Sequence, residues 1–473
     1  MQFFSTRDTN RKVTSSEAIA QGLSDEGGLF VPESFPQVDV RTLCELDYPA
    51  LAAAVIREYL TDYSPEFLAQ AARTTYGEAF GGKAGYLAPV EGDTYALELW
   101  HGPTCAFKDY ALQLMPRLLV EAKKNLGRTE KTLILVATSG DTGKAALDGY
   151  HDIPGVEIAV FYPTGGTSEI QRLQMATQEG ANVAVYAVRG NFDDAQTGVK
   201  RLFSDEALRE ELNKRGFFFS SANSINWGRV LPQIVYYVSA YCDLLRDEKI
   251  QPGQAINVCV PTGNFGNILA AYYAREMGVP IDKLICASNS NNVLTDFIRT
   301  GVYDCNRKFY NTESPSMDIL ISSNLERLLL TLTQDVDEVK GYMQQLNATG
   351  RYQVSDKVKE KLQQRFFGYC CDDAETEKVI GRIYAKDHYL VDPHTAVAFS
   401  ALEQYRAETG DETPCVVVST ASPFKFCGSV LSALGEKDIA SGLDVLDQLS
   451  EKTGLAAPAP LAGLRGKEVR FTT

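Results

Sequence analysis

From about residue 85 onward, short apolar runs rich in β-branched residues alternate with stretches of helical periodicity. Strands that alternate with amphipathic helices favour a mostly parallel sheet covered by helices on both faces. The runs LILVA and CVVVS are apolar throughout, as expected of strands that are buried on both sides. We therefore predict strands at 132–137, 157–162, 182–188, 256–260, 283–288 and 415–419.

This alternation does not extend over the whole chain, whose 473 residues are too many for one hydrophobic core. The N-terminal part begins with a turn-rich element, GLSDEGGLFVPE at 22–33, and continues with helical periodicity at 48–60 and 65–74. A more charged stretch further on carries predicted polar helices at 334–346 and 355–367. We predict an N-terminal segment at 1–85, a small α/β domain at 86–215, an inserted helical subdomain at 296–388, and a large α/β domain made of 216–295 and 389–473, on which the N-terminal segment packs.

Composition argues against several classes of function. The net charge of −15 repels a phosphate backbone, so we expect no nucleic-acid partner. An anionic ligand must then be held by local positive groups. Four histidines without an HxxxH pair, and ten cysteines without zinc-ligand or CxxC spacing, give no support for a metal site. We interpret the cysteines as buried reduced thiols.

Hydropathy indicates the expected compartment. No apolar run is long enough to span a bilayer, and the first residues, MQFFSTRDTNRK, lack the hydrophobic region of a signal peptide. We therefore expect a cytoplasmic protein that has no membrane partner. A monomer or a small homo-oligomer is the expected assembly.

The segment HGPTCAFKDYA at 101–111 places Lys108 between a Gly-Pro turn and a helical pattern. A lysine held against a buried helix loses water, which lowers its pKa and makes the neutral amine a nucleophile. Lys108 is therefore a candidate Schiff-base lysine; the alternative is an ordinary solvated lysine. The apolar positions of the following pattern fall on one helix face: Ala111, Leu112, Met115, Leu118, Leu119 and Ala122.

Two strand-to-helix junctions have the composition of anion sites. TSGDTG at 138–143 and PTGNFGN at 261–267 each follow a predicted strand and precede a predicted helix. Small residues there expose backbone N–H groups beside the positive end of the helix dipole. The first loop is equally compatible with an ordinary turn that caps a helix. It does not match GxxxxGK[ST], and the second loop does not match GxGxxG, which disfavours a dinucleotide fold.

Two further segments carry polar and charged side chains. SSANSINWGRVLPQ at 220–233 contains Arg229, whose guanidinium can fork onto a phosphate. The alternative is a polar loop with a helix cap and a solvated arginine. TASPFKF at 420–426 follows the last predicted strand, so Thr420 lies where a strand end meets a cleft. The alternatives are a Thr420 that bonds to nearby backbone and a Lys425 that is solvated at the surface.

Together these segments resemble threonine synthase, a family of pyridoxal-phosphate enzymes of the tryptophan-synthase-β fold type. The resemblance covers nearly the whole chain, and the longer type of the family carries an extra helical subdomain. It implies an α/β fold of two open, mostly parallel sheets wrapped by helices, with an N-terminal helical segment and an inserted helical subdomain. The segments that carry it are GLSDEGGLFVPE, HGPTCAFKDYALQ, ATSGDTGKAA, SSANSINWGRVLPQ, PTGNFGN, SPSMDILISSNLERLL and STASPFKF.

The resemblance also implies roles for individual residues. Lys108 resembles the lysine that binds pyridoxal phosphate covalently, and Phe107 helps to form its pocket. Thr420 is similar to the residue whose hydroxyl meets the pyridine nitrogen. The loop that cradles the cofactor phosphate corresponds to Gly263, Asn264, Phe265, Gly266 and Asn267. The loop that takes the substrate α-carboxylate corresponds to Ser139, Gly140, Asp141 and Thr142, and the substrate-phosphate ligands correspond to Asn223, Ser224 and Arg229.

One of these positions departs from related members of the fold type, which often have Asn where this chain has Asp141. The resemblance places this position near the cofactor O3′. An acidic side chain beside a phenolate repels it unless a proton is shared or a positive charge is paired with the carboxylate.

The reaction implied is O-phospho-L-homoserine plus water giving L-threonine and phosphate, the last step of threonine biosynthesis, with pyridoxal phosphate as the electron sink. Two alternatives remain open. The same fold supports serine or threonine dehydratases and cysteine synthases, which need no site for a substrate phosphate. The chain could also bind pyridoxal phosphate or a phosphorylated metabolite without turnover. Retention of Lys108 and of every loop argues against the second alternative.

Overall fold

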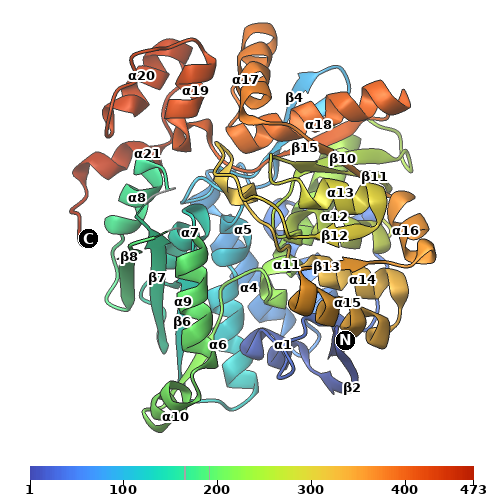
Figure 1. Cartoon of the computed structure of the whole chain (residues 1–473), viewed down its shortest axis with the longest axis vertical. Helices are drawn as coiled ribbons and strands as arrows, with labels where there is room; N and C mark the ends of the chain where they lie inside the picture. Colours follow the sequence, from blue (N-terminus) through green and yellow to red (C-terminus); the bar gives the residue numbers. More distant parts are fainter. Residues whose placement is uncertain (165–166, 191, 473) are drawn as a thin grey trace.

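The computed structural model of this chain describes residues 1–164, 167–190 and 192–472. Its largest sheet has the strand order β14-β11-β10-β15-β5-β4 (Figure 1). All neighbours in this sheet are parallel except the edge pair β4 and β5, which is antiparallel. The strands are β4 (Tyr86–Glu91), β5 (Thr94–Glu98), β10 (Ile256–Pro261), β11 (Ile281–Ser288), β14 (Phe366–Cys370) and β15 (Cys415–Ser419).

A second sheet with the order β8-β7-β6-β9 is parallel throughout and forms a separate layer, at the left of Figure 1. It is accompanied by α7 (Asp141–Tyr150), α8 (Glu169–Ala176) and α9 (Phe192–Ser204). The predicted fold class of two open, mostly parallel sheets with helices is confirmed, as are all six predicted strands. The strands of this sheet are β6 (Lys131–Ala137), β7 (Val156–Pro163), β8 (Val183–Val188) and β9 (Phe217–Ser220).

The N-terminal segment combines a small antiparallel sheet with helices. Its sheet has the order β2-β1-β3, made of β1 (Phe3–Ser5), β2 (Asp8–Val13) and β3 (Phe30–Pro32). The two predicted helices are confirmed as α3 (Tyr48–Tyr59) and α4 (Pro65–Tyr76). Each begins after a side-chain cap, Asp47 or Ser64, and has proline in its first turn. Both features favour a helix start, because they satisfy or remove backbone donors that lack a partner there.

The sheet pairing differs from the predicted segment boundaries in two places. The helix predicted at 355–367 ends early, as α16 (Asp356–Gln363), and β14 follows it and pairs in parallel with β11. A strand of the large sheet therefore lies inside the segment predicted to be a helical subdomain. Likewise β5, at the start of the predicted small domain, pairs with β15 of the large sheet. The rest of the domain division stays a prediction.

Physically, β14 forms because the run FFGYC is apolar and aromatic and is buried beside β11. Gly368 allows this approach, since a Cβ there would lie 2.8 Å from the Cα of Thr295 in the neighbouring helix α13 (Val293–Thr300). The other polar helix of this region is α15 (Val336–Thr349), close to its predicted bounds.

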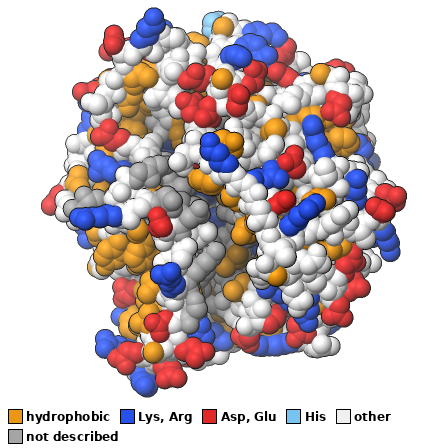
Figure 2. Space-filling model, in the orientation of Figure 1, with side chains coloured by type: hydrophobic (Ala, Val, Ile, Leu, Met, Phe, Trp, Pro, Cys, Tyr) orange, Lys and Arg blue, Asp and Glu red, His pale blue; other side chains and the backbone are white. Residues whose placement is uncertain are grey.

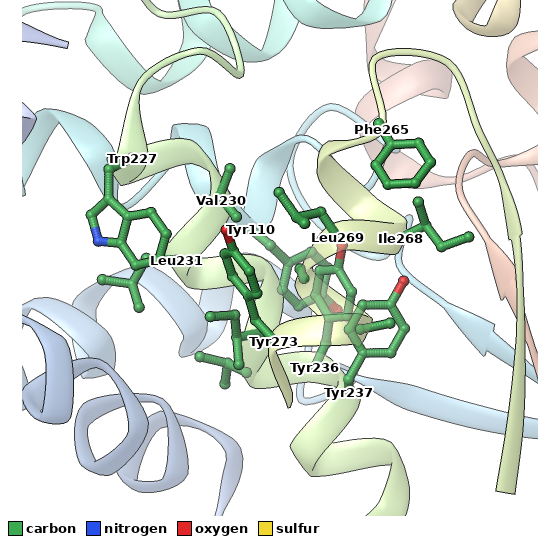
Figure 3. Packing of buried hydrophobic residues seen from close by; sticks show 14 of the residues in the cluster. Tyr110, Trp227, Val230, Leu231, Tyr236, Tyr237, Phe265, Ile268, Leu269 and Tyr273 are labelled. Carbon is green, nitrogen blue, oxygen red and sulfur yellow. The ribbon is translucent and has the colours of Figure 1, made fainter. Parts of the chain in front are cut away.

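One long helix, α11 (Trp227–Arg246), runs through the hydrophobic core and is buried along most of its length. Figure 3 shows Trp227, Tyr236 and Tyr237 on this helix among other buried aromatic side chains. The Trp227 ring lies 5.3 Å from Phe3 and 5.4 Å from Tyr59, which ties the helix to the N-terminal segment. This packing holds the N-terminus of α11, and with it Arg229, in a defined position.

The surface carries interspersed acidic and basic side chains, and the face in Figure 2 is hollowed near its middle. Among the residues that the structure describes, no helix combines the length and the apolar character needed to cross a bilayer. All ten cysteines belong to the described ranges, and each is a free thiol. The described residues also contain no group of three or more His, Cys, Asp or Glu side chains that could hold a metal ion.

Candidate active site

Lys108 lies where the segment 101–111 meets the segment 420–426. It immediately precedes the short helix α5 (Asp109–Leu112), and its side chain is almost completely buried. The backbone N–H of Phe107 donates to the carbonyl of Thr420 over 2.8 Å, and Ala106 forms a bridge with Ala421. These contacts place Lys108 at the carboxyl end of β15, where ligands bind in open α/β sheets.

The Lys108 amine has few polar neighbours. Its Nζ donates to the Ser316 hydroxyl over 3.3 Å, lies 3.6 Å from the Asp141 carboxylate and sits 4.8 Å from the centre of the Phe107 ring. Burial, with a further contribution from the charges of Lys425 and Arg229, lowers the pKa of Lys108 to about 8, although the charge of Asp141 opposes this shift. A sizeable fraction of the amine is therefore neutral near physiological pH, as a nucleophilic lysine requires.

The single helix predicted after Lys108 is in fact two helices, α5 and α6 (Met115–Asn125), with a break between them.

The Asp141 carboxylate is paired with a positive charge, which is one of the two conditions expected from the sequence. Its partner is Lys425. The Lys425 Nζ lies 2.7 Å from Asp141 Oδ1, and Gln171 Nε2 donates to the same oxygen over 2.8 Å. Burial by itself raises the pKa of Asp141, but the charges of Lys425 and Lys108 outweigh it and hold this pKa well below its usual range. The interpretation of Lys425 as a solvated lysine is wrong, because its side chain is completely buried.

The loop at 138–143 leads into α7, which begins at Asp141, three residues earlier than predicted. Gly140 precedes the helix with φ +147°, a conformation that other residues rarely adopt, and it makes no side-chain cap. Thr138 Oγ1 accepts hydrogen bonds from the backbone of Gly140 and Gly143. Ser139 and Thr142, beside them, are half-buried. Thr138 therefore satisfies one N–H of the first turn, and the remaining part of this helix N-terminus, next to Lys108, has the geometry of an anion site.

The loop after β10 leads into α12 (Gly266–Glu276) through Phe265, whose φ of +64° lies in the left-handed region. The N–H groups of a first helical turn have no intrahelical partner, and the N-cap residue Phe265 provides no side-chain acceptor for them. Gly263 must lack a side chain, because a Cβ there would lie 2.6 Å from the Ser316 carbonyl oxygen. Since Ser316 also contacts Lys108, this loop and Lys108 both lie next to Ser316.

Asn264 and Asn267 occupy different environments in this loop. Asn264 is exposed, and its carbonyl accepts from Asn324 Nδ2 over 2.9 Å. Asn267 is buried, and its Oδ1 accepts from the hydroxyls of Tyr236 and Tyr237 over 2.6 and 2.5 Å. Its Nδ2 is a buried donor for which the described structure provides no acceptor. An unpaired buried donor at a helix N-terminus is a suitable contact for an anionic ligand.

Arg229 lies in the first turn of α11 and is almost completely buried. One end of its guanidinium donates to the Ala222 carbonyl, whereas Nε is buried and has no partner among the described residues. Burial lowers the pKa of Arg229 to about 10, so it remains protonated at neutral pH. The solvated-arginine alternative is therefore wrong, and Arg229 presents an uncompensated positive charge to the interior.

The neighbouring polar residues join Arg229's loop to the loop before α12. Ser224 Oγ accepts from Asn324 Nδ2 over 3.0 Å, and the same amide donates to Asn264. Asn223 is half-buried, and its carbonyl accepts from the backbone of Asn226, the residue that caps α11. The structure thus brings the segments of Lys108, Asp141, the α12 loop, Arg229 and Thr420 together, while the roles of these residues stay predictions.

Four residues of the candidate site were given no functional role from the sequence: Ser316, Asn324, His394 and Lys425. Ser316 and Asn324 lie in the SPSMDILISSNLERLL segment, and Lys425 lies in STASPFKF, so the motifs contained them without indicating their contacts. His394 Nε2 accepts from the backbone of Ser316 over 3.1 Å, and its Nδ1 lies 2.6 Å from Asp392. No sequence signal joins His394 to Ser316, because 78 residues separate them.

Comparisons with known proteins agree with this arrangement. A family model described as "Pyridoxal-phosphate dependent enzyme" matches residues 88–421. Models of the "Threonine synthase N terminus" and of "Threonine synthase, C-terminal" match residues 2–76 and 395–473. The fold and these matches place the chain in the class of pyridoxal-phosphate-dependent α/β enzymes.

Individual relatives identify the family within this class. The chain is 37% identical to threonine synthase of Saccharomyces cerevisiae, over 95% of this chain and 92% of the relative. It resembles the crystal structure of pyridoxal-phosphate-bound threonine synthase from Brucella melitensis with a TM-score of 0.88 and 34% identity, covering 100% of this chain and 96% of that one. The chain belongs to the threonine synthase family.

Some relatives are longer proteins with a different name. The chain is 41% identical to threonine synthase-like 1 of Homo sapiens over 92% of its own length. It spans about three-fifths, 61%, of that relative.

Proposed function

We propose that this protein is a threonine synthase that uses pyridoxal phosphate to convert O-phospho-L-homoserine and water into L-threonine and phosphate. The observation that carries the proposal is Arg229, a buried guanidinium that acts electrostatically on Lys108 and whose Nε has no partner among the described residues. A dehydratase or a cysteine synthase has no substrate phosphate to neutralise such a charge. Family membership supports the same reaction.

The described residues fit the cofactor in three respects. Lys108 is a buried amine with a lowered pKa, suited to covalent attachment of an aldehyde. The uncapped N-terminus of α12 and the unpaired Asn267 Nδ2 suit a phosphate group. Thr420, buried at the end of β15 beside Phe107, provides a hydroxyl for the pyridine nitrogen. When bound, pyridoxal phosphate supplies an electron sink conjugated with the substrate Cα.

The substrate's two anionic groups are assigned to two separate sites. The α-carboxylate binds at the N-terminus of α7, formed by Ser139, Gly140 and Thr142. The γ-phosphate binds at the N-terminus of α11, to Arg229 with Asn223 and Ser224. Two such contacts fix the carbon chain between them and bring Cα and Cβ to Lys108, which lowers the entropic part of the barrier.

Lys108 then works as the acid and base of the reaction. Once the substrate amine has displaced it, the free Lys108 amine takes a proton from Cα and then from Cβ. Loss of the Cβ proton breaks the bond from Cγ to the phosphate oxygen, and Arg229 holds the departing phosphate. Lys108 returns one proton to Cγ and one to Cα, water adds its hydroxyl to Cβ, and the remaining proton of that water goes to the released phosphate. The balance is one water consumed for one phosphate released.

The decisive experiment incubates the purified protein, loaded with pyridoxal phosphate, with O-phospho-L-homoserine and measures phosphate and threonine together. We expect both products in equal amounts, and neither from the variant Lys108→Ala. Phosphate without threonine would indicate elimination alone, and oxo-acid formation from serine or threonine would indicate a dehydratase. A protein that binds the cofactor but releases no product would support the non-catalytic alternative.

We further propose that the protein works in the cytoplasm. All ten cysteines are free thiols in the described ranges, which is typical of a reducing compartment.

A further inference from the structure

Lys425 carries a completely buried charge that the proposed reaction does not use. It ends the short helical turn η3 (Pro423–Lys425), which follows β15. Its Nζ donates to the Thr104 carbonyl over 2.9 Å and lies 2.7 Å from Asp141 Oδ1. A buried ammonium is costly unless it is paired, so its position against Asp141 requires an explanation.

The Asp141 carboxylate stands between two lysines and is closer to Lys425 than to Lys108. Its Oδ1 lies 2.7 Å from Lys425, and its Oδ2 lies 3.6 Å from Lys108. Gln171 Nε2 also donates to Oδ1, which holds that oxygen on the Lys425 side. One carboxylate can neutralise one ammonium. Because Lys425 is nearer than Lys108, Lys425 has the stronger electrostatic interaction with the Asp141 carboxylate.

We infer that Lys425 is a positioning residue whose ammonium neutralises Asp141, so that the Lys108 amine remains free to attach the cofactor instead of being held in an ion pair. This inference rests on the proposed role of Lys108. It assigns Lys425 no contact with substrate or cofactor.

The charges around both lysines agree with this role. Lys108 is influenced by Asp141 from α7, Lys425 from η3 and Arg229 from α11, and the last two lower its pKa. Lys425 acts electrostatically on Asp141, on the Cys105 thiol and on Asp109, whose pKa burial raises to about 7. Without Lys425, Asp141 would be left to Lys108 alone, and the proton on Lys108 would be held more tightly.

The pair also joins the two sheets. Asp141 begins a helix that packs on the small sheet, whereas Lys425 follows β15 of the large sheet. A second bond in the same place connects Ser168 Oγ, which caps α8, with the Lys425 carbonyl over 3.1 Å. An ionised Asp141 with a buried partner accounts for an acidic residue where related enzymes often have Asn.

The test follows attachment of pyridoxal phosphate to the full-length apoprotein. Protein and cofactor are mixed between pH 6 and pH 10, trapped with borohydride, and the labelled Lys108 peptide is quantified by mass spectrometry. For the wild type we expect the initial rate to rise with pH to a midpoint near pH 8. Lys425→Met should move this midpoint up by about one unit or more, so that attachment at pH 7 slows about tenfold.

Charge-compensated variants separate electrostatics from structural damage. Asp141→Asn should move the midpoint down, and the double variant Asp141→Asn/Lys425→Met should return it to within about half a unit of the wild type. Lys425→Arg should keep the wild-type midpoint. Lys144→Met is the matched control, because Lys144 is also a buried lysine, on α7, but it pairs with Asp148 and Gln178.

An unchanged midpoint in Lys425→Met, or a double variant that keeps the shift of Lys425→Met, would overturn the inference. If Lys425→Met does not fold, the other two variants still test the inference. Asp141→Asn must lower the pH midpoint of attachment, and the double variant must have a midpoint close to that of the wild type. A wild-type protein that is labelled at a lysine other than Lys108 would refute the proposed function itself, which keeps the two failures distinct.

Discussion

Replacing Arg229 with alanine tests the proposed substrate-phosphate site most directly. The variant removes a buried guanidinium whose Nε has no partner in the described part of the chain, so no internal hydrogen bond of that nitrogen is lost. Within the described residues, the other end of the guanidinium donates to the Ala222 carbonyl. We therefore expect a large effect on the phosphorylated substrate and a small effect on the fold.

The size of the effect follows from the bond that Nε is free to make. A hydrogen bond between a charged donor and a phosphate contributes about 1.5–3 kcal/mol. Losing one such bond lowers kcat/KM roughly ten- to hundredfold, and losing a two-pronged contact lowers it further. Arg229→Lys keeps the charge but not the fork, so its kcat/KM should lie between the wild type and Arg229→Ala.

Three measurements are needed on the same preparations: kcat/KM for O-phospho-L-homoserine, the inhibition constant of inorganic phosphate, and the dissociation constant of pyridoxal phosphate. In Arg229→Ala, kcat/KM should fall and the inhibition constant of phosphate should rise. The dissociation constant of pyridoxal phosphate should stay nearly constant. Arg246→Ala is the matched control, because Arg246 lies on the same helix at its exposed end and pairs with Asp243.

Loss of pyridoxal phosphate from Arg229→Ala, with an unchanged inhibition constant for phosphate, would refute the assignment. It would mean that Arg229 binds the cofactor phosphate and that the two phosphate sites are exchanged. Wild-type kinetics in Arg229→Ala would remove the main argument for a phosphorylated substrate.

Three further outcomes are expected. Lys108→Ala should lose the borohydride-trapped cofactor and all turnover, and label recovered on another lysine would contradict the role of Lys108. Thr420→Ala should weaken pyridoxal phosphate binding by about 1 kcal/mol, or roughly fivefold in the dissociation constant measured by titration of the apoprotein. Trp227→Ala should lower the free energy of unfolding by about 3–5 kcal/mol, seen as a lower urea midpoint, since Trp227 is fully buried against Phe3 and Tyr59; a change under 1 kcal/mol would show that this core is not tightly packed.

Much of the fold was predictable because its strongest signals are local. A run such as CVVVS needs only its own side chains to favour a strand buried on both faces, and β15 formed where predicted. The loops after β6 and β10 were likewise recognisable, since glycine is needed wherever the chain turns sharply into a helix. The order of these motifs was enough to indicate the family.

The errors occurred where a residue's state depends on distant segments. The FFGYC run became β14 because β11 offers it a parallel partner, and nothing in the charged helix before it signals that edge. The short strand β9 was missed for a similar reason, since its four residues acquire strand geometry by pairing with β6. Strand pairing is a long-range property, so local periodicity does not determine it.

By itself, the sequence determined which residues are candidates for the chemistry: one lysine after a Gly-Pro turn, two glycine-containing loops at helix starts, and an arginine near the start of a third helix. Only the tertiary structure decided their protonation and pairing. Lys425 was read as solvated, yet it is buried against Asp141, which lies 284 positions earlier in the printed sequence. Burial and charge pairing depend on which atoms surround a group in space, and those atoms come from segments that local sequence does not connect.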